Sequence, residues 1–522
     1  MSDSRPEAGR RVASAAGLLA ASVLLARVLG YLRDALFARE VGIGGDADAY
    51  FAAFMIPDML GYLLAAGAAS TAVTPPYLKR LENEGETVAA RFASIVVGNV
   101  ALVSIVLTVL LWWGAEPLLR LQFPEFDRAT LDETVRLMRI VLPAQIFFLT
   151  GGILRGVLMA HGRFAPQASA AVFYSFAPIV GSLLMEGADG FAWGTLVGAA
   201  IGQWAIPVIA LRRLPGAVGR MRVGIFDGDF REYVWLALPL MLGIGLTTVD
   251  EWYEKWVGGT IGMGAIAAIT YARKLMMAPV GVIGQAVGAA LLPSLTGLHQ
   301  RGEPEGFRDL LTDTLRATLG LGLLAGGALV SLATPVVRLL YERGRFTADD
   351  TSEVASLLVL LALAVPGWVV QQVAVRGFYA RGEMWLAMGL STTIALAVFP
   401  IYLAAGRASG VSGLAAASAI AISANALITV GWLRVRTGSP ALRPILETLL
   451  RSVLICVAAT AATVLALPRF AERLPNAVVV LGIGGVLYAV VASVGLALLG
   501  DEATRAQLAR VLGRLRRARS SA

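Results

Sequence analysis

The amino-acid sequence predicts an all-α polytopic membrane protein with about fourteen transmembrane helices. Hydrophobic residues make up 57% of the 522 residues and charged residues only 15%, whereas a soluble domain carries about 25% charged residues. The mean hydropathy is +0.71. Apolar runs of about 20 residues, the length that spans the hydrocarbon core of a bilayer, recur along the whole chain. Together these observations exclude an ordinary soluble domain.

Fourteen apolar runs are long enough to be membrane spans. The first seven lie at 13–37, 47–75, 89–112, 134–158, 164–186, 191–213 and 233–256. The second seven lie at 264–297, 311–334, 352–378, 385–405, 411–434, 446–468 and 476–499.

Basic residues are unequally distributed between the loops on the two sides of these spans. With the N-terminus in the cytoplasm, the richer set of loops includes Arg212, Arg213, Arg434 and Arg436 together with both tails. Cytoplasmic loops carry an excess of Lys and Arg, so both termini are expected in the cytoplasm. This topology explains the net charge of +8, and no nucleic-acid partner is expected.

The residue types that usually carry catalysis or bind metals are scarce. Cys456 is the only cysteine, and His161 and His299 are the only histidines, so no Cys/His metal site is expected. None of the three lysines follows a glycine, which argues against a Walker-type phosphate loop. No nucleophile, base and orienting group occur at a recognisable spacing, so the sequence predicts neither an enzyme nor a bound cofactor.

The two halves of the chain are similar to each other. Phe54–Glu86 aligns without gaps with Tyr271–Glu303, and Pro76 then matches Pro293. The repeat predicts two six-helix lobes in the same orientation, an arrangement typical of transporters. The predicted divisions are an N-terminal lobe at 1–215, a C-terminal lobe at 232–437, two extra helices at 441–500 and a basic tail at 501–522.

The tail combines an apolar stripe of Leu508, Leu512 and Leu515 with several arginines. This pattern predicts an amphipathic helix on the anionic inner leaflet. An ordinary basic tail that only sets the topology is an equally good interpretation.

Five charged residues interrupt the first two apolar runs, namely Arg27, Arg33, Asp34, Asp48 and Asp58. A charge at the centre of a membrane helix costs roughly 2.5–3.5 kcal/mol on insertion scales. Such charges persist where they face water, a partner charge or a polar ligand. One interpretation is an internal Arg–Asp pair that holds helices together; the other, which we favour, is a polar cavity for a charged cargo.

Four stretches of the chain are distinctive: Arg27–Pro75, which begins RVLGYLRDALFARE, Tyr271–Leu295 (YARKLMMAPVGVIGQAVGAALLPSL), Leu339–Thr351 (LLYERGRFTADDT) and Val365–Glu383 (VPGWVVQQVAVRGFYARGE). They resemble the MurJ/MviN family of lipid II flippases, within the multidrug/oligosaccharidyl-lipid/polysaccharide exporter superfamily. The resemblance covers essentially the whole chain. It implies an alternating-access carrier in the bacterial cytoplasmic membrane that moves lipid II, an undecaprenyl-pyrophosphate-linked glycopeptide, to the outer leaflet for peptidoglycan synthesis.

The resemblance also implies partners and a site. Arg27, Arg33, Asp34 and Asp48 match functional positions of the family motif, and Lys274 stands where the family has an essential arginine. Cationic side chains suit a pyrophosphate, although lysine lacks the planar fork of arginine. The expected partners are lipid II and the bilayer, with a coupling cation or the membrane potential as a further candidate. The two extra helices are expected to form a groove for the lipid tail.

Two positions depart from the family pattern. Gly61 replaces an arginine, and Ala65 replaces a glutamate. These residues are four apart, so one charged helix face has become a face of small residues, which suits close helix packing. Their effect on headgroup binding is left open.

Secondary candidates are Arg273, Gln285 and Asp58. Gln285 shares a helix face with Lys274, whereas Arg273 is directed about 100° away and suits the membrane interface.

Asp250 and Glu254 are candidates for cation coupling, with an interfacial ion-pair cluster as the preferred alternative. Arg155 and Arg376 are expected to reach the cytoplasmic interface rather than the cargo.

Three functions therefore remain in competition. The first is lipid II export, and the second is export of another polyprenyl-linked oligosaccharide or drug/cation antiport. The third is a membrane scaffold without transport activity.

Overall fold

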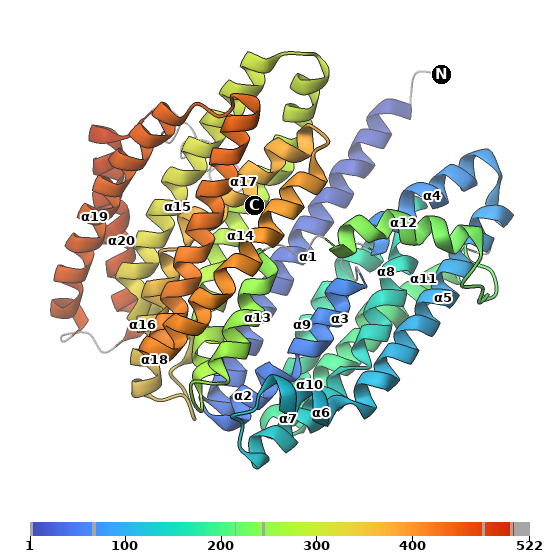
Figure 1. Ribbon diagram of the computed structural model, residues 1–522, viewed down its shortest axis with the longest axis horizontal. Coiled ribbons are helices and arrows are strands. Elements are labelled where there is room, and N and C mark those ends of the chain that lie inside the picture. The colour runs from blue at the N-terminus through green and yellow to red at the C-terminus, as the bar shows by residue number, and fades with distance from the viewer. Residues whose placement is uncertain are drawn as a thin grey trace. The chain divides into compact units, whose positions relative to one another are not determined.

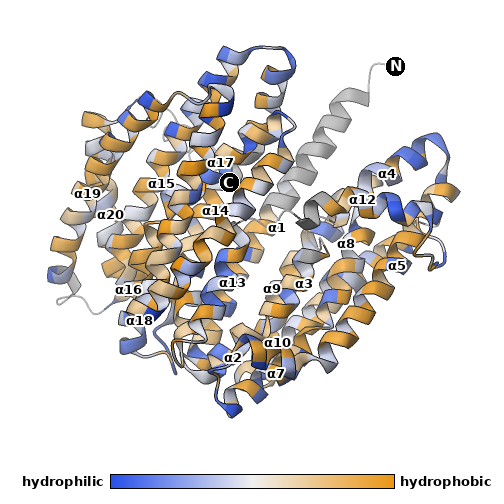
Figure 2. Cartoon of the chain, viewed as in Figure 1, coloured by the Kyte–Doolittle hydropathy of each residue, from blue (hydrophilic) through white to orange (hydrophobic). Residues whose placement is uncertain are grey.

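The computed structural model describes residues 4–64, 69–214, 216–242, 246–471, 476–501 and 505. These residues form helices and connecting turns, and no strand occurs among them (Figure 1). The predicted all-α fold class is confirmed. Figure 2 shows hydrophobic residues along most of α5 (Glu86–Trp113), α19 (Leu442–Ala471) and α20 (Ala477–Leu499), as expected for helices that contact lipid.

Within the described residues, nine helices are long and apolar enough to cross a membrane. The bent pair α16 (Ala348–Ala362) and α17 (Val365–Ala380) would make a tenth span. One of the nine, α18 (Met384–Thr437), covers two predicted spans, because its backbone breaks at Ser409 and Gly410.

The predicted spans at 13–37, 47–75 and 233–256 each include residues that the structure does not fully describe, so these three spans stay predictions. Charged residues interrupt α1 (Ser4–Val41), and the other two runs are divided between shorter helices. The chain is a polytopic membrane protein.

The chain forms two compact units, and the first contains the described residues up to Leu242 together with Gly262–Gly264 and Arg343–Phe346. Its remaining helices are α2 (Gly45–Ala53), α3 (Met55–Leu63), α4 (Ala69–Asn83), α6 (Ala115–Gln122), α7 (Arg128–Val141), α8 (Ala144–Ala160), α9 (Ala165–Leu184), α10 (Gly187–Gly198), the π-helix η1 (Ala199–Ala205), α11 (Ile206–Leu211) and α12 (Gly228–Leu242). One of its cores lies between α4, α5, α8 and α12, where Tyr77, Phe92, Val157 and Tyr233 are buried.

The segment between α11 and α12 lies against α5 instead of forming a free loop. The Asn99 side chain donates to the Gly224 carbonyl (3.1 Å) and accepts from the Gly224 N–H (2.9 Å). A Cβ atom at Gly98 would lie 2.2 Å from the Arg222 carbonyl oxygen, so the close approach requires glycine there. Val223 and Phe226 are exposed beside this contact.

The second unit contains the described residues 246–261, Ala265–Glu342 and the described residues after Phe346. Its remaining helices are α13 (Leu246–Gly258), α14 (Ala265–Gln300) and α15 (Pro304–Tyr341). Leu311, Phe378 and Leu433 join α15, α17 and α18 in one core. A second core contains Ile455 of α19 and Tyr488 of α20, whose hydroxyl donates to the Leu324 carbonyl (2.7 Å).

Corresponding turns in the two units have the same backbone conformation. Gly162 follows α8 with φ +70°, and Gly382 follows α17 with φ +75°. Both values favour glycine. The division into lobes stays a prediction. The seventh predicted span, 233–256, is shared between the units, since α12 belongs to the first and α13 to the second.

Most of the predicted amphipathic tail, 502–504 and 506–522, lies outside the described residues. Just before it, Asp501 accepts a hydrogen bond from Thr448 and forms an ion pair with Arg316 (3.0 Å). These contacts join the end of α20 to α19 and α15.

Candidate functional site

The first polar cluster lies in the first unit, on the last turns of α1. Arg33 Nη2 lies 3.0 Å from Asp34 Oδ1, and the Asp34 side chain is buried. The aromatic rings of Phe37 and Tyr50 pack 4.4 Å apart one turn further along. This packing holds the Arg33–Asp34 pair beside an apolar wall.

Two tyrosines complete this cluster. The phenol groups of Tyr50 on α2 and Tyr174 on α9 lie within electrostatic reach of both Arg33 and Asp58. The structure thus brings together the predicted Arg33, Asp34 and Asp58. These tyrosines were not predicted from the sequence, because an aromatic residue in an apolar run has the same pattern as a core residue.

Asp48 has a defined backbone partner. Its carboxylate is buried and Oδ2 accepts a hydrogen bond from the Gly264 N–H at 2.6 Å. This contact holds the Gly262–Gly264 turn onto α2 within the first unit. The structure therefore gives Asp48 a structural contact that its predicted role as a substrate ligand did not anticipate.

The other predicted positions of the first unit are less enclosed. Arg27 is half-buried on α1 and lies within electrostatic reach of Tyr31. Gly61 is half-buried on α3, and Ala65 lies outside the described residues.

The second polar cluster lies in the second unit and is fully buried. Asp250 and Glu254 are four residues apart on α13, which places both on one helix face. Arg273 of α14 lies between them: its Nε donates to Glu254 Oε2 at 2.5 Å, and its Nη2 donates to Asp250. The exposed fractions are 0% for Asp250, 1% for Glu254 and 5% for Arg273.

Two hydroxyl groups from α18 complete the second cluster. Ser418 donates to Asp250 Oδ2 at 2.9 Å and accepts from Arg273 at 3.0 Å, while the Tyr402 hydroxyl also donates to Asp250. The Trp368 ring of α17 lies 5.8 Å from the Arg273 guanidinium. Ser418, Tyr402 and Trp368 were not predicted from the sequence, since they lie far from Asp250 along the chain.

These contacts change the interpretation of two predictions. Arg273 was expected to suit the membrane interface, but its charged end is buried among carboxylates. The Asp250–Glu254 group was expected to be interfacial, but it lies inside the second unit.

Lys274 is half-buried on α14 and lies within electrostatic reach of Glu251, which pairs with Lys255 at 2.8 Å. Gln285 also lies on α14, but its side chain is outside the described part of the structure.

Arg155 is a further buried cation, and the expectation that it reaches the interface is wrong. Its side chain is 8% exposed, and Nη1 donates to the Gln203 carbonyl of η1 at 3.0 Å. A π-helix disturbs the regular hydrogen-bond ladder, and Arg155 binds a carbonyl within that disturbed stretch.

No metal site is apparent in the described part of the chain, because its His, Cys, Asp and Glu side chains form no group of three that would hold a metal ion. The two clusters instead pair cations with acids and hydroxyl groups inside apolar helical units. Many apolar helices with buried charged clusters define a polytopic membrane protein with polar sites inside its helical units. The same fold occurs in an inward-facing multidrug resistance MATE family transporter of the MOP superfamily (TM-score 0.66, 16% identity, covering 79% of this chain and 94% of that one).

A family model described as lipid II flippase MurJ matches residues 37–481. The chain belongs to this family.

Relatives and a solved structure agree with this assignment. A probable lipid II flippase MurJ of Rhizobium tropici is 29% identical over 401 residues, covering 73% of this chain and 74% of the relative. Its counterpart in Bdellovibrio bacteriovorus is 28% identical and covers 88% of both chains. The structure of a lipid II flippase MurJ in an inward closed conformation superimposes with a TM-score of 0.75 at 21% identity, over 93% of this chain and 100% of that one.

Proposed function

We propose that this protein moves lipid II, the polyprenyl-pyrophosphate-linked peptidoglycan precursor, from the inner to the outer leaflet of a bacterial cytoplasmic membrane by alternating access. The observation that carries the proposal is the family match across residues 37–481. The curated relatives with similar length and the shared fold support it. A drug/cation antiporter or an exporter of another oligosaccharide is less well supported, because the matching family model is that of the lipid II flippase.

Each unit has cationic side chains that suit a pyrophosphate. In the first unit, Arg33 lies with its guanidinium against Asp34 and within reach of two phenol groups. Asp34 would keep Arg33 extended when no cargo is bound, and the tyrosine hydroxyl groups would donate to phosphate oxygens. In the second unit Lys274 would supply a further positive charge.

An apolar groove in the second unit suits the polyprenyl tail. Two adjoining cavities of about 480 and 400 Å³ lie along α15 and α19, and Val330 and Val464 line both. Most other lining residues are apolar, including Leu323, Val457 and Leu467. A hydrocarbon chain in this groove would stay in an environment similar to lipid while the headgroup crosses the membrane.

The Asp250–Glu254 cluster is better suited to a structural role than to cation coupling. Arg273 already occupies the space between the two carboxylates. A coupling cation would therefore have to displace a buried guanidinium that also binds Ser418.

We also propose that both termini lie in the cytoplasm, on the basis of the loop charges. Reporter fusions after residues 187, 260, 346 and 408 should then report the outside, and fusions after 218 and 438 the inside. A reversed pattern in either half would contradict this orientation.

The function is tested in a bacterium depleted of its own lipid II flippase. Expression of this chain should restore growth and return externally accessible lipid II to the parental level. Lys274→Gln should lower the export rate at least about tenfold, since a hydrogen bond to a charged group contributes roughly 1.5–3 kcal/mol. Lys274→Arg should retain export. The matched control is Lys79→Gln, because Lys79 is exposed on α4.

Normal membrane abundance without growth or external lipid II would refute lipid II export. If Lys274→Gln exports at the parental rate, Lys274 does not bind the cargo, although the function itself would stand.

A further inference from the structure

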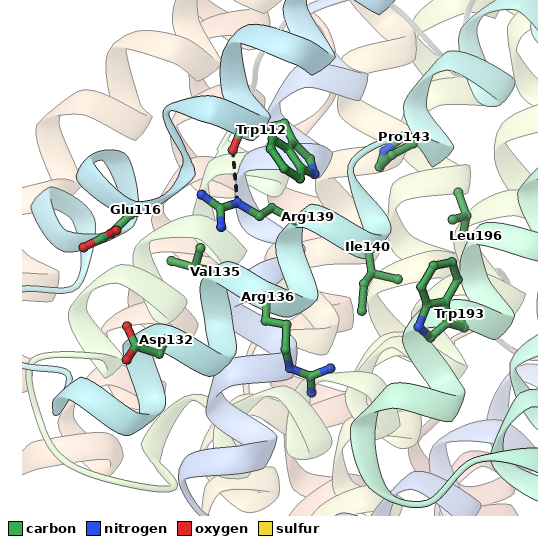
Figure 3. Close-up of a pocket in the computed structure, with 10 residues that line it drawn as sticks. All are labelled: Trp112, Glu116, Asp132, Val135, Arg136, Arg139, Ile140, Pro143, Trp193 and Leu196. Carbon is green, nitrogen blue, oxygen red and sulfur yellow. Dashed lines mark hydrogen bonds between the residues drawn. The ribbon is translucent and has the colours of Figure 1, made fainter.

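A cavity of about 600 Å³ in the first unit plays no part in the proposed transport path. It lies between the end of α5, α6, α7 and the second half of α10 (Figure 3). Its chemically distinctive lining residues are Trp112, Glu116, Asp132, Arg136, Arg139 and Trp193. The cavity thus combines two tryptophans, two carboxylates and two guanidinium groups.

Arg139 differs from the other arginines around this cavity. Its Nε donates to the Trp112 carbonyl at 3.2 Å, and its guanidinium lies 4.8 Å from the centre of the Trp112 ring. Within the described residues no carboxylate lies within ion-pair distance of Arg139, and its terminal amino groups have no protein acceptor. In contrast, Arg136 is paired with both Glu133 and Asp189 at 2.6 Å.

The two carboxylates that line the cavity are exposed, and each forms only a surface ion pair. Glu116 pairs with Arg120 at 2.9 Å, and Asp132 lies 3.8 Å from Arg128. Exposed pairs of this kind contribute little stability, so both acids are available to a cationic ligand. Figure 3 shows the Arg139 guanidinium directed toward the side that holds Glu116 and Asp132, with Trp193 and Leu196 on the opposite side. A ligand in the cavity would therefore meet a cation and two anions together.

The cavity lies where membrane spans end. α5 and the stretch Arg128–Ala160 are both candidate spans, and the first ends and the second begins beside the cavity. Trp113 and Trp193 are 74% and 44% exposed, and Leu121 on α6 is 80% exposed. Tryptophans gather at the level of lipid headgroups. In the orientation proposed above, this end of the spans faces the outer leaflet.

We propose that this cavity binds the headgroup of an outer-leaflet phospholipid that carries both a phosphate and a primary ammonium group, of the phosphatidylethanolamine type. The phosphate accepts hydrogen bonds from the terminal amino groups of Arg139, in charge-assisted geometry. The ammonium group donates to Glu116 and Asp132, and the acyl chains follow the apolar surface of α5. An anionic lipid such as phosphatidylglycerol fits less well, because it has no cation for the two carboxylates.

The test uses the purified, delipidated full chain and native mass spectrometry with three lipids of equal chain length. Phosphatidylethanolamine should bind more tightly than phosphatidylcholine, which has no N–H donor, and than phosphatidylglycerol. Arg139→Gln should weaken phosphatidylethanolamine binding about tenfold, through loss of a charged hydrogen bond. Arg163→Gln, in the exposed turn after α8, is the control and should change nothing.

A second variant leaves the contact between Arg139 and Trp112 unchanged. Glu116→Gln with Asp132→Asn alters exposed side chains only, and it should remove the preference for phosphatidylethanolamine over phosphatidylcholine. Equal binding of the three lipids by the parental protein would overturn the proposal. So would a preference for phosphatidylglycerol, or a parental ethanolamine preference that survives in both variants.

Discussion

Replacement of Arg273 by methionine is expected to destabilise the second unit severely. Arg273 is the cation for Asp250 and Glu254, both of which are almost completely buried. Loss of one partner from a buried ion pair costs about 3–5 kcal/mol, because the remaining charge has no compensation. Each kcal/mol lowers the melting temperature of a domain of 150–250 residues by about 2–4 °C, so a fall of about 10 °C is expected.

The assay is thermal unfolding of the purified protein in detergent, followed by intrinsic fluorescence. Arg443→Met is the matched control, because Arg443 is 92% exposed and pairs with Glu447 at 3.1 Å on the same helix. An exposed pair of this kind contributes at most about 1 kcal/mol, so the control should melt close to the parental temperature.

A triple variant separates charge from packing. Arg273→Met combined with Asp250→Asn and Glu254→Gln removes all three charges and should recover most of the lost stability. If Arg273→Met melts within about 2 °C of the parental protein, the buried network does not hold the unit together. If the triple variant is as unstable as the single one, packing rather than charge explains the loss. A stable triple variant that fails to export lipid II would give the cluster a role in transport.

Two further predictions concern single contacts in the first unit. Asp48→Ala should lower the free energy of unfolding by about 1–3 kcal/mol, since the Gly264 N–H loses its acceptor. Asp48→Asn should restore the parental melting temperature. An export defect that persists in Asp48→Asn would show that transport requires the charge. Asn99→Leu should speed amide hydrogen exchange in residues 219–226 because both hydrogen bonds to Gly224 are lost; unchanged exchange would mean that other contacts hold the segment on α5.

The sequence by itself determined the fold class and most of the membrane spans. The free energy of placing a helix in lipid depends on the composition of the helix itself, so long apolar runs such as α5 and α20 are visible locally. The shared face of Asp250 and Glu254 was also predictable, because residues four apart on one helix lie on the same side. Family motifs then indicated the function.

Only the tertiary structure decided which partners the buried charges have. Arg273 and Lys274 are adjacent in the sequence, yet packing places Arg273 between two carboxylates and leaves Lys274 half-buried. Asp48 accepts a hydrogen bond from the Gly264 N–H, and Arg155 donates one to the Gln203 carbonyl, each across a long stretch of chain. Periodicity specifies which face a side chain occupies but not which helix covers that face. The cost of burying a charge is settled by the partner that the covering helix supplies.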